Sequence, residues 1–394
     1  MGNLAVKLTP KAEKIIKKGH PWVFSDSIVK LNKKGKTGDI AILFSRQTNQ
    51  VYAIGLYDPE SAVRIKIIHR GSGVPIDAFF FKRKMEQAYA IRNPLLQGNT
   101  NAYRFIYGEN DDFPGMILDV YNGIGVLKIY SAIWFSHLPS LIPYMAEISQ
   151  VKAIVLRLSR KLQEGKTPYR EGDVILGKLK SPEVIFKEYG VHFKIDVIQG
   201  HKTGFFLDHR DNRRRIGAMA EGKTVLDVFS YAGGFSIHAL VGGAREVTAV
   251  DSSVQALKLA EENAALNLHQ GKLHTLAGDA FELLEKLAEE GQKFDVIVID
   301  PPSFAKRKKE KEIAKKKYAE LARLGVQLAH RGTVLLLASC SSRISKAEFL
   351  AAHRREFSAL GVKYRIEAIT GHDLDHPITF DEGSYLKSVY YRIL

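Results

Sequence analysis

Apolar runs alternate with amphipathic stretches from about residue 197 to the end of the chain. Short continuous apolar runs predict buried strands, and apolar positions that recur with a helical period predict helices between them. This alternation is typical of a doubly wound parallel sheet with helices on both faces. We expect strands over residues 224–229, 246–251, 272–278, 293–300, 333–339 and 388–394. Between them we expect amphipathic helices, for example over residues 254–266 and 280–290.

The first half of the chain has a different pattern and predicts two further parts. Up to residue 72, short β-like runs at 39–44 and 63–69 are separated by turns, which predicts a small β-rich module. A linker over 70–75 and a helix over 77–93 follow. Further strands are expected at 115–121, 125–131 and 152–158, with a hairpin over 183–196 that turns at Gly190. The expected organisation is a β-rich module (1–72), an α+β domain (76–190) and a doubly wound α/β domain (191–394).

Charge and composition narrow the class of protein. Lys and Arg number 58 against 43 Asp and Glu, a net charge of +15, and residues 1–38 alone hold nine lysines and two acids. Such an excess favours a polyanionic partner such as RNA, because phosphate contacts release counterions; a solvated basic surface is the alternative. The single cysteine excludes an intramolecular disulfide, and no apolar stretch is long enough to span a membrane. The N-terminus lacks the pattern of a signal peptide, so we expect a cytoplasmic protein without a membrane partner.

Four acids and the only cysteine fall at or just past the ends of predicted strands. They are Asp227, Asp251, Asp279, Asp300 and Cys340. Ligands of a doubly wound sheet bind at this edge, so we expect the functional site there. One acid at a strand end is often only a helix N-cap, but acids at consecutive strand ends together predict a ligand site.

The stretch VLDVFSYAGGFS (225–236) indicates which cofactor the sheet binds. Its adjacent glycines, Gly233 and Gly234, let the backbone approach a ligand closely. A dinucleotide site would show G-x-G-x-x-G and hold a diphosphate, whereas here Asp227 stands beside the turn and suits a cation. S-adenosylmethionine carries an ammonium and a sulfonium and no phosphate. We therefore expect S-adenosylmethionine as the cofactor, with a nicotinamide cofactor as the alternative.

The other cofactor contacts are expected at the neighbouring strand ends. Asp251 is placed to accept hydrogen bonds from the ribose hydroxyls, and Asp279 from the adenine amine beside the backbone of Ala280. Three flanking residues are also expected to line the cofactor site: Phe229, Tyr231 and Ser252. The histidines do not show metal-ligand spacing with the thiol, so we expect no metal site; those considered are His192, His201, His209 and His238.

Cys340 is either core filler, the common role of an isolated cysteine, or a nucleophile. In VIDPPSFAK (298–306) two prolines hold Asp300 rigidly at the end of the fourth strand. Enzymes that methylate an exocyclic amine usually place an aromatic directly after Asp-Pro-Pro, but here Ser303 takes that position and Phe304 follows. We therefore favour C5 of a pyrimidine as the target. In that chemistry a Cys340 thiolate adds to C6, and Asp300 holds or protonates N3.

Several stretches of the chain occur together in one family. They are GHPWVFSDSI (19–28), FIYGENDDFPGMILDVYN (105–122), KTGFFLDHRDNRR (202–214), VLDVFSYAGGFS, VIDPPSFAK and ASCSSR. Over essentially its whole length the sequence resembles the PUA-containing ribosomal RNA large-subunit methyltransferases that make 5-methylcytosine. The resemblance implies a PUA-like RNA-binding module over 1–72, a middle α+β domain, and a Rossmann-like methyltransferase domain with Cys340 as nucleophile. Its implied partner is large-subunit ribosomal RNA, and a homodimer is left open.

The resemblance also implies roles for residues near the cofactor. Phe205 or Phe206 would line its pocket, and Lys202 or Arg210 would pair with the methionine carboxylate. Many RNA cytosine-5 methyltransferases carry a second cysteine after the proline of the fourth-strand motif, where this chain has Ser303. The group that aids product release is therefore left open.

RNA contacts are expected from Trp22, by stacking, and from the basic segment KRKKEKEIAKKK (306–317), which begins with Lys306, Arg307 and Lys308. The alternatives are a core position for Trp22 and a solvated helix face for the segment. Lys306, Arg307, Arg343 or the sulfonium is also expected to lower the pKa of the thiol. Two other functions stay open. One is methylation of an amine of guanine or adenine, and the other is a non-catalytic RNA-binding ribosome assembly factor.

Overall fold

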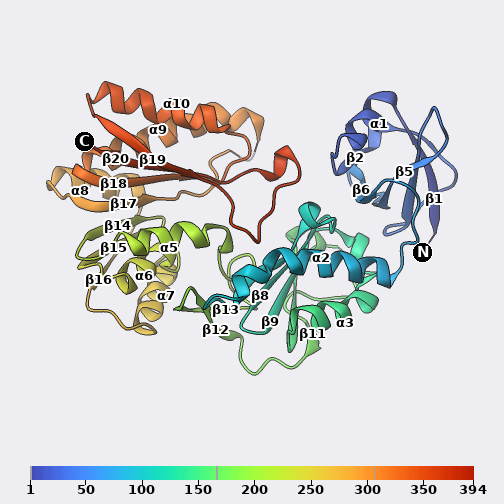
Figure 1. The fold of residues 1–394 in the computed structure, drawn as a ribbon, viewed down its shortest axis with the longest axis horizontal. Coiled ribbons are helices and arrows are strands. Elements are labelled where there is room, and N and C mark those ends of the chain that lie inside the picture. Colours follow the sequence, from blue (N-terminus) through green and yellow to red (C-terminus); the bar gives the residue numbers. More distant parts are fainter. Residues whose placement is uncertain (1, 166, 306) are drawn as a thin grey trace. The chain divides into compact units, whose positions relative to one another are not determined.

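The computed structural model describes residues 2–165, 167–305 and 307–394, without the side chain of Lys308. The chain forms two compact units (Figure 1). The first comprises Met1–Lys187, Ile195–Leu207 and Leu374–Gly383, and the second Glu188–Lys194, Asp208–Asp373 and Ser384–Leu394. The first unit therefore includes the predicted β-rich module and most of the predicted α+β domain, and the three-domain boundaries stay a prediction. None of the described helices is long and apolar enough to cross a membrane.

A six-stranded sheet forms the N-terminal part of the first unit, in the order β2-β6-β5-β4-β1-β3. Its elements are β1 (Asn3–Leu8), α1 (Pro10–Lys17), β2 (Trp22–Phe24), β3 (Ile28–Leu31), β4 (Ile40–Phe44), β5 (Val51–Tyr57) and β6 (Val63–Arg70). Burial alternates along β1, where Leu4, Val6 and Leu8 enter the core and the residues between them are less buried. This is the period-two pattern of a strand with one buried face. The strands predicted at 39–44 and 63–69 are confirmed as β4 and β6.

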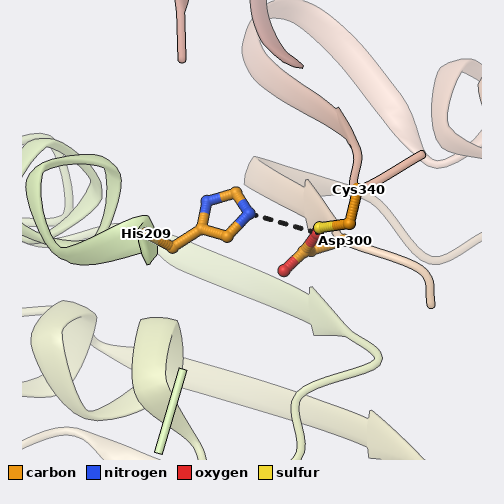
Figure 2. A group of neighbouring side chains, drawn as sticks. All are labelled: His209, Asp300 and Cys340. Atoms are coloured by element: carbon orange, nitrogen blue, oxygen red, sulfur yellow. Dashed lines mark hydrogen bonds and ion pairs between the residues drawn. The ribbon is translucent and has the colours of Figure 1, made fainter. Parts of the chain in front are cut away.

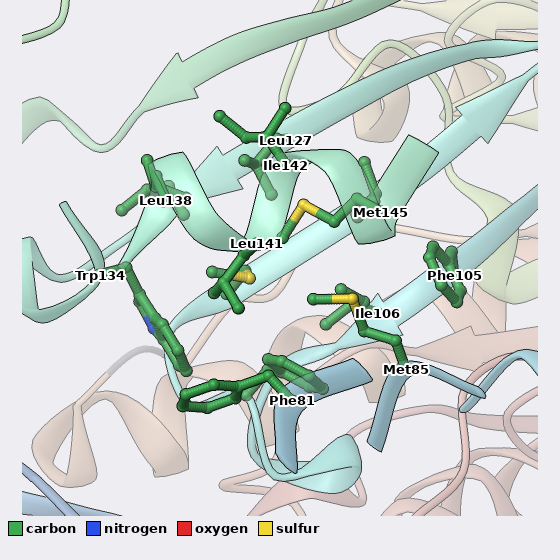
Figure 3. Close-up of a cluster of buried hydrophobic side chains, with 14 of the residues drawn as sticks. Phe81, Met85, Phe105, Ile106, Leu127, Trp134, Leu138, Leu141, Ile142 and Met145 are labelled. Atoms are coloured by element: carbon green, nitrogen blue, oxygen red, sulfur yellow. The ribbon is translucent and has the colours of Figure 1, made fainter. Parts of the chain in front are cut away.

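A second, five-stranded sheet of the first unit has the order β11-β10-β9-β8-β7. The elements are α2 (Ala78–Leu96), β7 (Ala102–Tyr107), β8 (Met116–Tyr121), β9 (Ile124–Ile129), α3 (Leu138–Ser149), β10 (Ala153–Leu158), α4 (Arg160–Gln163) and β11 (Val174–Gly177). Phe81 and Met85 of α2 lie in one buried cluster with Leu141 and Met145 of α3 (Figure 3). The strands predicted at 115–121, 125–131 and 152–158 are confirmed.

Helix α2 departs from the prediction, which ended it at Asn93. It begins after Asp77, whose carboxylate accepts from the Phe80 backbone N–H at 2.8 Å, and continues through Pro94 to Leu96. Proline removes one N–H donor and crowds the preceding turn. Leu95 is nevertheless buried in the core, so packing carries the helix past the proline. The predicted helix end was therefore wrong.

Seven strands form the sheet of the second unit, in the order β16-β15-β14-β17-β18-β20-β19. They are β14 (Thr224–Val228), β15 (Glu246–Asp251), β16 (Lys272–Ala277), β17 (Phe294–Ile299), β18 (Ala329–Ser339), β19 (Tyr364–Thr370) and β20 (Lys387–Ile393). The strands from β16 to β18 are parallel, and β20 is antiparallel to both β18 and β19. This confirms the predicted sheet. The unpredicted β19 is an edge strand with charged positions such as Arg365 and Glu367, which hide its strand pattern.

Helices cover both faces of this sheet (Figure 1). On one face lie α5 (Arg210–Ala218), α6 (Gly234–Val241) and α7 (Val254–Ala265), and on the other α8 (Ala280–Glu289), α9 (Lys311–Gln327) and α10 (Lys346–Ala359). The helices predicted over 254–266 and 280–290 are confirmed as α7 and α8. The predicted hairpin is also confirmed, as β12 (Glu183–Glu188) and β13 (Val191–Asp196), with a φ of 85° at Gly190 in its turn.

Candidate active site

The sheet of the second unit brings the predicted site residues to one edge. β14 pairs with β15 on one side and with β17 on the other, and β17 pairs with β18. All of these pairs are parallel, so the strands have their carboxyl ends at the same edge, where ligands of such sheets bind. Four predicted residues lie at or near these ends: Asp227 in β14, Asp251 ending β15, Asp300 after β17 and Cys340 after β18.

The glycine turn after β14 has a constrained backbone. Phe229 and Tyr231 have φ values of 64° and 49°, in the left-handed region, and Gly233 has a φ of 78°. Left-handed conformations of non-glycine residues cost roughly 1–3 kcal/mol each and persist where the surroundings fix them. A Cβ at Gly233 would lie 2.8 Å from the Cβ of Ala260 in α7. The turn is therefore packed closely against α7, and glycine is required at position 233.

Asp227 has one satisfied and one unsatisfied carboxylate oxygen. Oδ2 accepts from the backbone N–H of Ser236 at 3.0 Å and from its hydroxyl at 2.6 Å. Oδ1 is buried and has no hydrogen-bond partner among the described residues. Burial raises the pKa of this carboxyl to about 7. A buried oxygen without a partner costs free energy, and a cationic ligand group at the turn would supply the missing donor.

Asp251 connects the glycine turn to the end of β15. Its Oδ2 accepts from the Tyr231 N–H and its Oδ1 from the Ser253 N–H, both at 2.9 Å. Each carboxylate oxygen has a second lone pair, so the two oxygens can still accept from the two hydroxyls of a ribose. The neighbouring Ser252 is exposed. The cofactor contacts of Asp251 and Ser252 stay predictions.

Asp279 caps the N-terminus of α8. Its Oδ1 accepts from the Phe281 N–H at 2.9 Å, which is the ordinary N-cap role of an acid at a strand end. Ala280 is buried as the first residue of the helix. The contact of these two residues with an adenine ring therefore stays a prediction.

Cys340, Asp300 and His209 form one compact group (Figure 2). Sγ of Cys340 lies 3.7 Å from Oδ1 of Asp300, and Nε2 of His209 lies 3.3 Å from the same oxygen. One nitrogen, oxygen or sulfur atom of each residue lies within 4.8 Å of the others. Cys340 is partly exposed and the Asp300 side chain is 21% exposed, so a substrate can reach both. The structure therefore brings the two predicted catalytic residues together, and their roles in catalysis stay predictions.

His209 was not predicted to belong to this group. It ends the short 3-10 helix η4 (Leu207–His209), directly before α5, and its side chain is 2% exposed. Burial opposes a charged imidazole, but the Asp300 carboxylate outweighs burial and raises the pKa of His209 above its usual value. The spacing of the histidines in the sequence did not point to the thiol, yet His209 lies in one group with Cys340. The contact joins segments that are far apart in the chain, which sequence spacing does not reveal.

Imidazole, carboxylate and thiol at this spacing resemble a metal site, but the hydrogen bonds of His209 favour another role. The side-chain nitrogen of Asn212 lies 3.0 Å from Nδ1 of His209. Because an amide nitrogen only donates, Nδ1 is the acceptor in this orientation of the amide, and the ring hydrogen sits on Nε2, 3.3 Å from Asp300 Oδ1. In this tautomer Nε2 has no lone pair to offer a metal ion. We therefore interpret His209, Asp300 and Cys340 as residues that transfer a proton and provide a nucleophilic thiol, and not as metal ligands.

A buried cation lies on the strand next to Cys340. Lys387 begins β20 opposite Ser339, the residue before Cys340. Its ammonium donates to the carbonyl oxygens of Ser341 and Ile344, at 2.5 and 2.7 Å, and the residue is 8% exposed. Burial lowers the pKa of Lys387 to about 8, against the opposing effect of Cys340. This lysine was not predicted, and the only sign of it in the sequence is a charged residue at the start of an apolar strand.

Two residues assigned to the cofactor by resemblance have other contacts. Arg210 is fully buried, and its Nη1 donates to Asp373 at 2.9 Å. Phe206 belongs to the first unit, where Nζ of Lys202 lies 4.4 Å from its ring centroid. A cofactor contact by Arg210 or Phe206 stays a prediction.

The residues predicted to contact RNA are only partly described. Trp22 is half-buried, and its indole N–H donates to Glu109 at 3.0 Å. Arg307 is exposed, as a phosphate-binding side chain must be. Lys306 and the side chain of Lys308 lie outside the described residues. RNA binding by these four residues stays a prediction.

Fold and site together define a methyltransferase that uses S-adenosylmethionine. A family model of S-adenosylmethionine-dependent methyltransferases matches residues 161–391, and a model of a PUA-like domain matches residues 6–70. A solved methyltransferase structure complexed with SAH is similar over 100% of both chains, with a TM-score of 0.83 and 20% identity. A methyltransferase structure from Streptococcus mutans has the same TM-score and identity. These two likenesses establish the fold.

The curated relatives place the chain in a narrower family. A ribosomal RNA large subunit methyltransferase of Deinococcus radiodurans is 39% identical, over 99% of this chain and 97% of the relative. Ribosomal RNA large subunit methyltransferase I of Klebsiella pneumoniae is 33% identical, over 97% of this chain and 96% of the relative. The chain belongs to the family of ribosomal RNA large subunit methyltransferases. The expected family, PUA-like domain and cofactor class are thus confirmed, and the methylated base is not part of these names.

Proposed function

We propose that the protein transfers a methyl group from S-adenosylmethionine to C5 of a cytosine in large-subunit ribosomal RNA. The observation behind this proposal is the distance of 3.7 Å between Cys340 Sγ and Asp300 Oδ1, just past the ends of two adjacent parallel strands. C5 of a pyrimidine is a weak nucleophile and needs a thiolate at C6, whereas an exocyclic amine needs none. The names of the relatives support ribosomal RNA of the large subunit as the substrate.

Each residue at the strand ends then has a task. When bound, S-adenosylmethionine supplies an electrophilic methyl group, and Asp227, Asp251 and the glycine turn are the groups placed to hold it. Cys340 Sγ forms a bond to C6 while Asp300 passes a proton to N3, which makes C5 the nucleophilic carbon of an enamine. After C5 has been methylated, a base takes its hydrogen as a proton, the Sγ–C6 bond breaks, and N3 returns its proton to Asp300. These events restore the aromatic base and the free thiolate.

The covalent step requires Cys340 as a thiolate. A free thiol has a pKa of about 8.5 and is lowered by a nearby cation. Lys387 supplies such a cation on the adjacent strand, with its ammonium fixed by the carbonyl oxygens of Ser341 and Ile344. Because the ammonium is buried, its charge is poorly screened by water and acts on the thiol more strongly than a surface lysine would.

Charge and domain content support RNA as the methyl acceptor. The chain carries a net charge of +15, and nine lysines against two acids fall within residues 1–38. That stretch lies largely inside the PUA-like domain at residues 6–70. Positive charge of this kind neutralises phosphates and supplies the sequence-independent part of the affinity for nucleic acid.

Bisulfite sequencing of large-subunit ribosomal RNA tests the proposal directly. RNA from a strain that lacks the gene is compared with RNA from the same strain carrying the wild-type gene or the Cys340→Ala variant. We expect at least one cytosine to resist deamination only when the wild-type gene is present. If no cytosine differs and nucleoside mass spectrometry instead finds a missing methylated guanine or adenine, the cytosine assignment is overturned and an amine becomes the target.

A further inference from the structure

His209 is buried beside Asp300, yet no step of the proposed methylation uses it. Its Nε2 lies 3.3 Å from Asp300 Oδ1, the oxygen that also lies 3.7 Å from the Cys340 thiol (Figure 2). An imidazole is the side chain whose ordinary pKa lies closest to neutrality. His209 therefore lies beside the carboxyl that gives a proton to N3, where it can exchange a proton with that carboxyl.

The far side of the imidazole is held by an amide. The side-chain nitrogen of Asn212 lies 3.0 Å from Nδ1 of His209 and also donates to the Ser388 hydroxyl at 3.2 Å. The side-chain oxygen of Asn212 accepts from Thr370 at 2.6 Å and from Tyr390 at 2.9 Å. In this arrangement His209 is neutral, with its hydrogen on Nε2, which lies 3.3 Å from Asp300 Oδ1.

This network can also accommodate a protonated His209. The three partners of the Asn212 amide are hydroxyls, and each hydroxyl can donate or accept. If the amide turns over, its oxygen faces Nδ1 and accepts a second ring hydrogen, while the three hydroxyls exchange their roles. Both atoms of the amide then still face a partner. The surroundings therefore permit His209 to take up and release a proton.

The charges around His209 favour uptake of that proton. Burial opposes the charged imidazolium, and so does Arg213 of α5, whereas the carboxylates of Asp300 and Asp208 support it. The uncharged ring of Phe235 packs edge-on against the imidazole at a centroid distance of 5.5 Å. The balance raises the pKa of His209 above its usual value.

We propose that His209 is a positioning residue that stores the proton which Asp300 delivers to N3 of the cytosine. An isolated aspartate has a pKa of about 3.9 and holds almost no proton at neutral pH, whereas an interacting pair of groups titrates as a unit. Nε2 of His209 gives its proton to Asp300, and the carboxyl gives a proton to N3 as the Sγ–C6 bond forms. When that bond breaks, N3 returns the proton by the same route. This role rests on the proposed function.

An NMR titration tests, in the absence of RNA, whether His209 holds a proton near neutral pH. The full chain labelled with 13C-histidine is titrated from pH 5 to pH 9, and the His209 signal is identified by its absence in His209→Gln. We expect His209 to titrate above 6.5, the ordinary value for histidine, and Asp300→Asn to lower its midpoint. A midpoint at or below 6.5 in the wild type, or one that Asp300→Asn leaves unchanged, overturns the proposal.

The pH dependence of methylation tests the role in the reaction. Gln at position 209 keeps a polar side chain with an N–H but cannot take up a proton. We expect His209→Gln to lower kcat at pH 8 by roughly tenfold or more, to approach wild-type kcat at pH 6, and to leave KM for RNA unchanged. His353→Gln is the matched control. His353 is also buried, and its Nδ1 lies 2.9 Å from the Tyr391 hydroxyl, outside the group of His209, Asp300 and Cys340.

The outcomes separate the two proposals. If His209→Gln has the pH profile of the wild type, His209 only packs beside Asp300 and stores no proton. If the wild type methylates no cytosine, the proposed function fails together with the role at N3, even where the NMR titration finds the expected pair. If the wild type methylates cytosine but His209 titrates at or below pH 6.5, only the proposal that His209 stores a proton is overturned.

Discussion

Cys340 Sγ and Asp300 Oδ1 lie 3.7 Å apart although the two residues follow different strands of the sheet. β17 and β18 are parallel neighbours, and their register pairs Ile299 with Leu337. Strand order therefore brings the residues past both strand ends to the same edge of the sheet, where the thiol and the carboxyl meet. The reaction that this contact supports can be tested by removing either group.

Replacing Cys340 by alanine should abolish RNA methylation and leave cofactor binding intact, because the thiol supplies only the covalent step. RNA that contains 5-fluorocytosine should trap the wild type as a covalent complex, since fluorine cannot leave as a proton does. Denaturing gel electrophoresis should show the complex for the wild type and not for the variant. A part-exposed thiol should cost no more than about 1 kcal/mol of stability when truncated.

Cys340→Ser is the matched control for this experiment, because it keeps the size and a hydroxyl but has a much weaker nucleophile. It should trap no complex and should bind S-adenosylhomocysteine like the wild type. Full methylation by Cys340→Ala would instead show that the thiol is packing, and Asp300 would become the acceptor for an exocyclic amine.

Much of this site was predictable from the sequence because it depends on local patterns. The apolar runs that end at Asp251, Asp300 and Cys340 form buried parallel strands. The alternation of strands and helices makes these strands parallel, so that their carboxyl ends lie at the same edge of the sheet. The glycine turn also has a local cause, since position 233 requires a left-handed backbone beside α7.

The residues that were missed depend on packing between distant segments. His209 precedes α5, and nothing near it in the sequence points to Asp300 or Cys340. Lys387 belongs to β20, which lies antiparallel between β18 and β19. The alternation of strands and helices predicts the order of parallel strands, but it does not predict where an antiparallel strand is inserted. The end of α2 was missed for a related reason, because burial of Leu95 overrides the local effect of Pro94.

Removing the Asp251 carboxylate should weaken the binding of S-adenosylhomocysteine by roughly 10- to 100-fold. The magnitude corresponds to about 1.5–3 kcal/mol for hydrogen bonds to a charged acceptor. Asp251→Ala removes the acceptors for the ribose and also the bond from the Tyr231 N–H that fixes the glycine turn. Isothermal titration calorimetry measures the affinity, and the melting temperature of the free protein measures the structural cost.

Asp295→Ala is the control for this measurement. Asp295 lies near the start of β17 and accepts from the Thr224 N–H at 2.9 Å, so it makes a similar backbone bond at the opposite edge of the same sheet. Its loss should lower the melting temperature without changing the affinity for S-adenosylhomocysteine. If both variants lose the same affinity for S-adenosylhomocysteine, Asp251 affects binding only by stabilising the fold and does not contact the ribose.

The stability of the free protein should fall with rising pH because of Asp227. Burial raises its pKa in the folded protein to about 7, from 3.8. The neutral carboxyl therefore contributes stability that is fully present below pH 3.8 and is lost as the pH rises through about 7. Asp227→Asn carries no such charge and should gain about 2 kcal/mol over the wild type between pH 5 and pH 7. Urea denaturation at both pH values measures the difference, and a constant difference would contradict the prediction.

Cofactor affinity should change in the opposite direction at the same residue. A cationic group of S-adenosylhomocysteine needs the ionised form of Asp227, so the affinity of the wild type should rise as the pH passes about 7. Asp227→Asn should bind more weakly and show no rise over this range. Calorimetry from pH 6 to pH 8.5 gives both curves. Parallel curves for wild type and variant would mean that Asp227 does not meet a cation.

Replacing Lys387 by methionine should raise the pKa of the Cys340 thiol, because the buried ammonium that favours the thiolate is lost. The rate of alkylation by iodoacetamide reports the thiolate fraction, and Cys340 is the only cysteine in the chain. At pH 7.5 we expect the rate to fall by about tenfold, equivalent to one unit of thiol pKa. Rates measured from pH 6 to pH 9.5 give the thiol pKa itself.

The Lys387 experiment needs controls for folding and for charge in general. Lys387 also holds the carbonyl oxygens of Ser341 and Ile344, so the variant must be shown by its melting curve and circular dichroism to be folded. Lys387→Arg keeps the positive charge and should keep the thiol pKa nearly unchanged, whereas Lys346→Met removes an exposed charge at the start of α10 and should have little effect. A folded Lys387→Met whose alkylation profile matches that of the wild type would show that the thiolate is stabilised by another group. The bound sulfonium would then be the next candidate, and the alkylation rate would have to rise when S-adenosylmethionine is added.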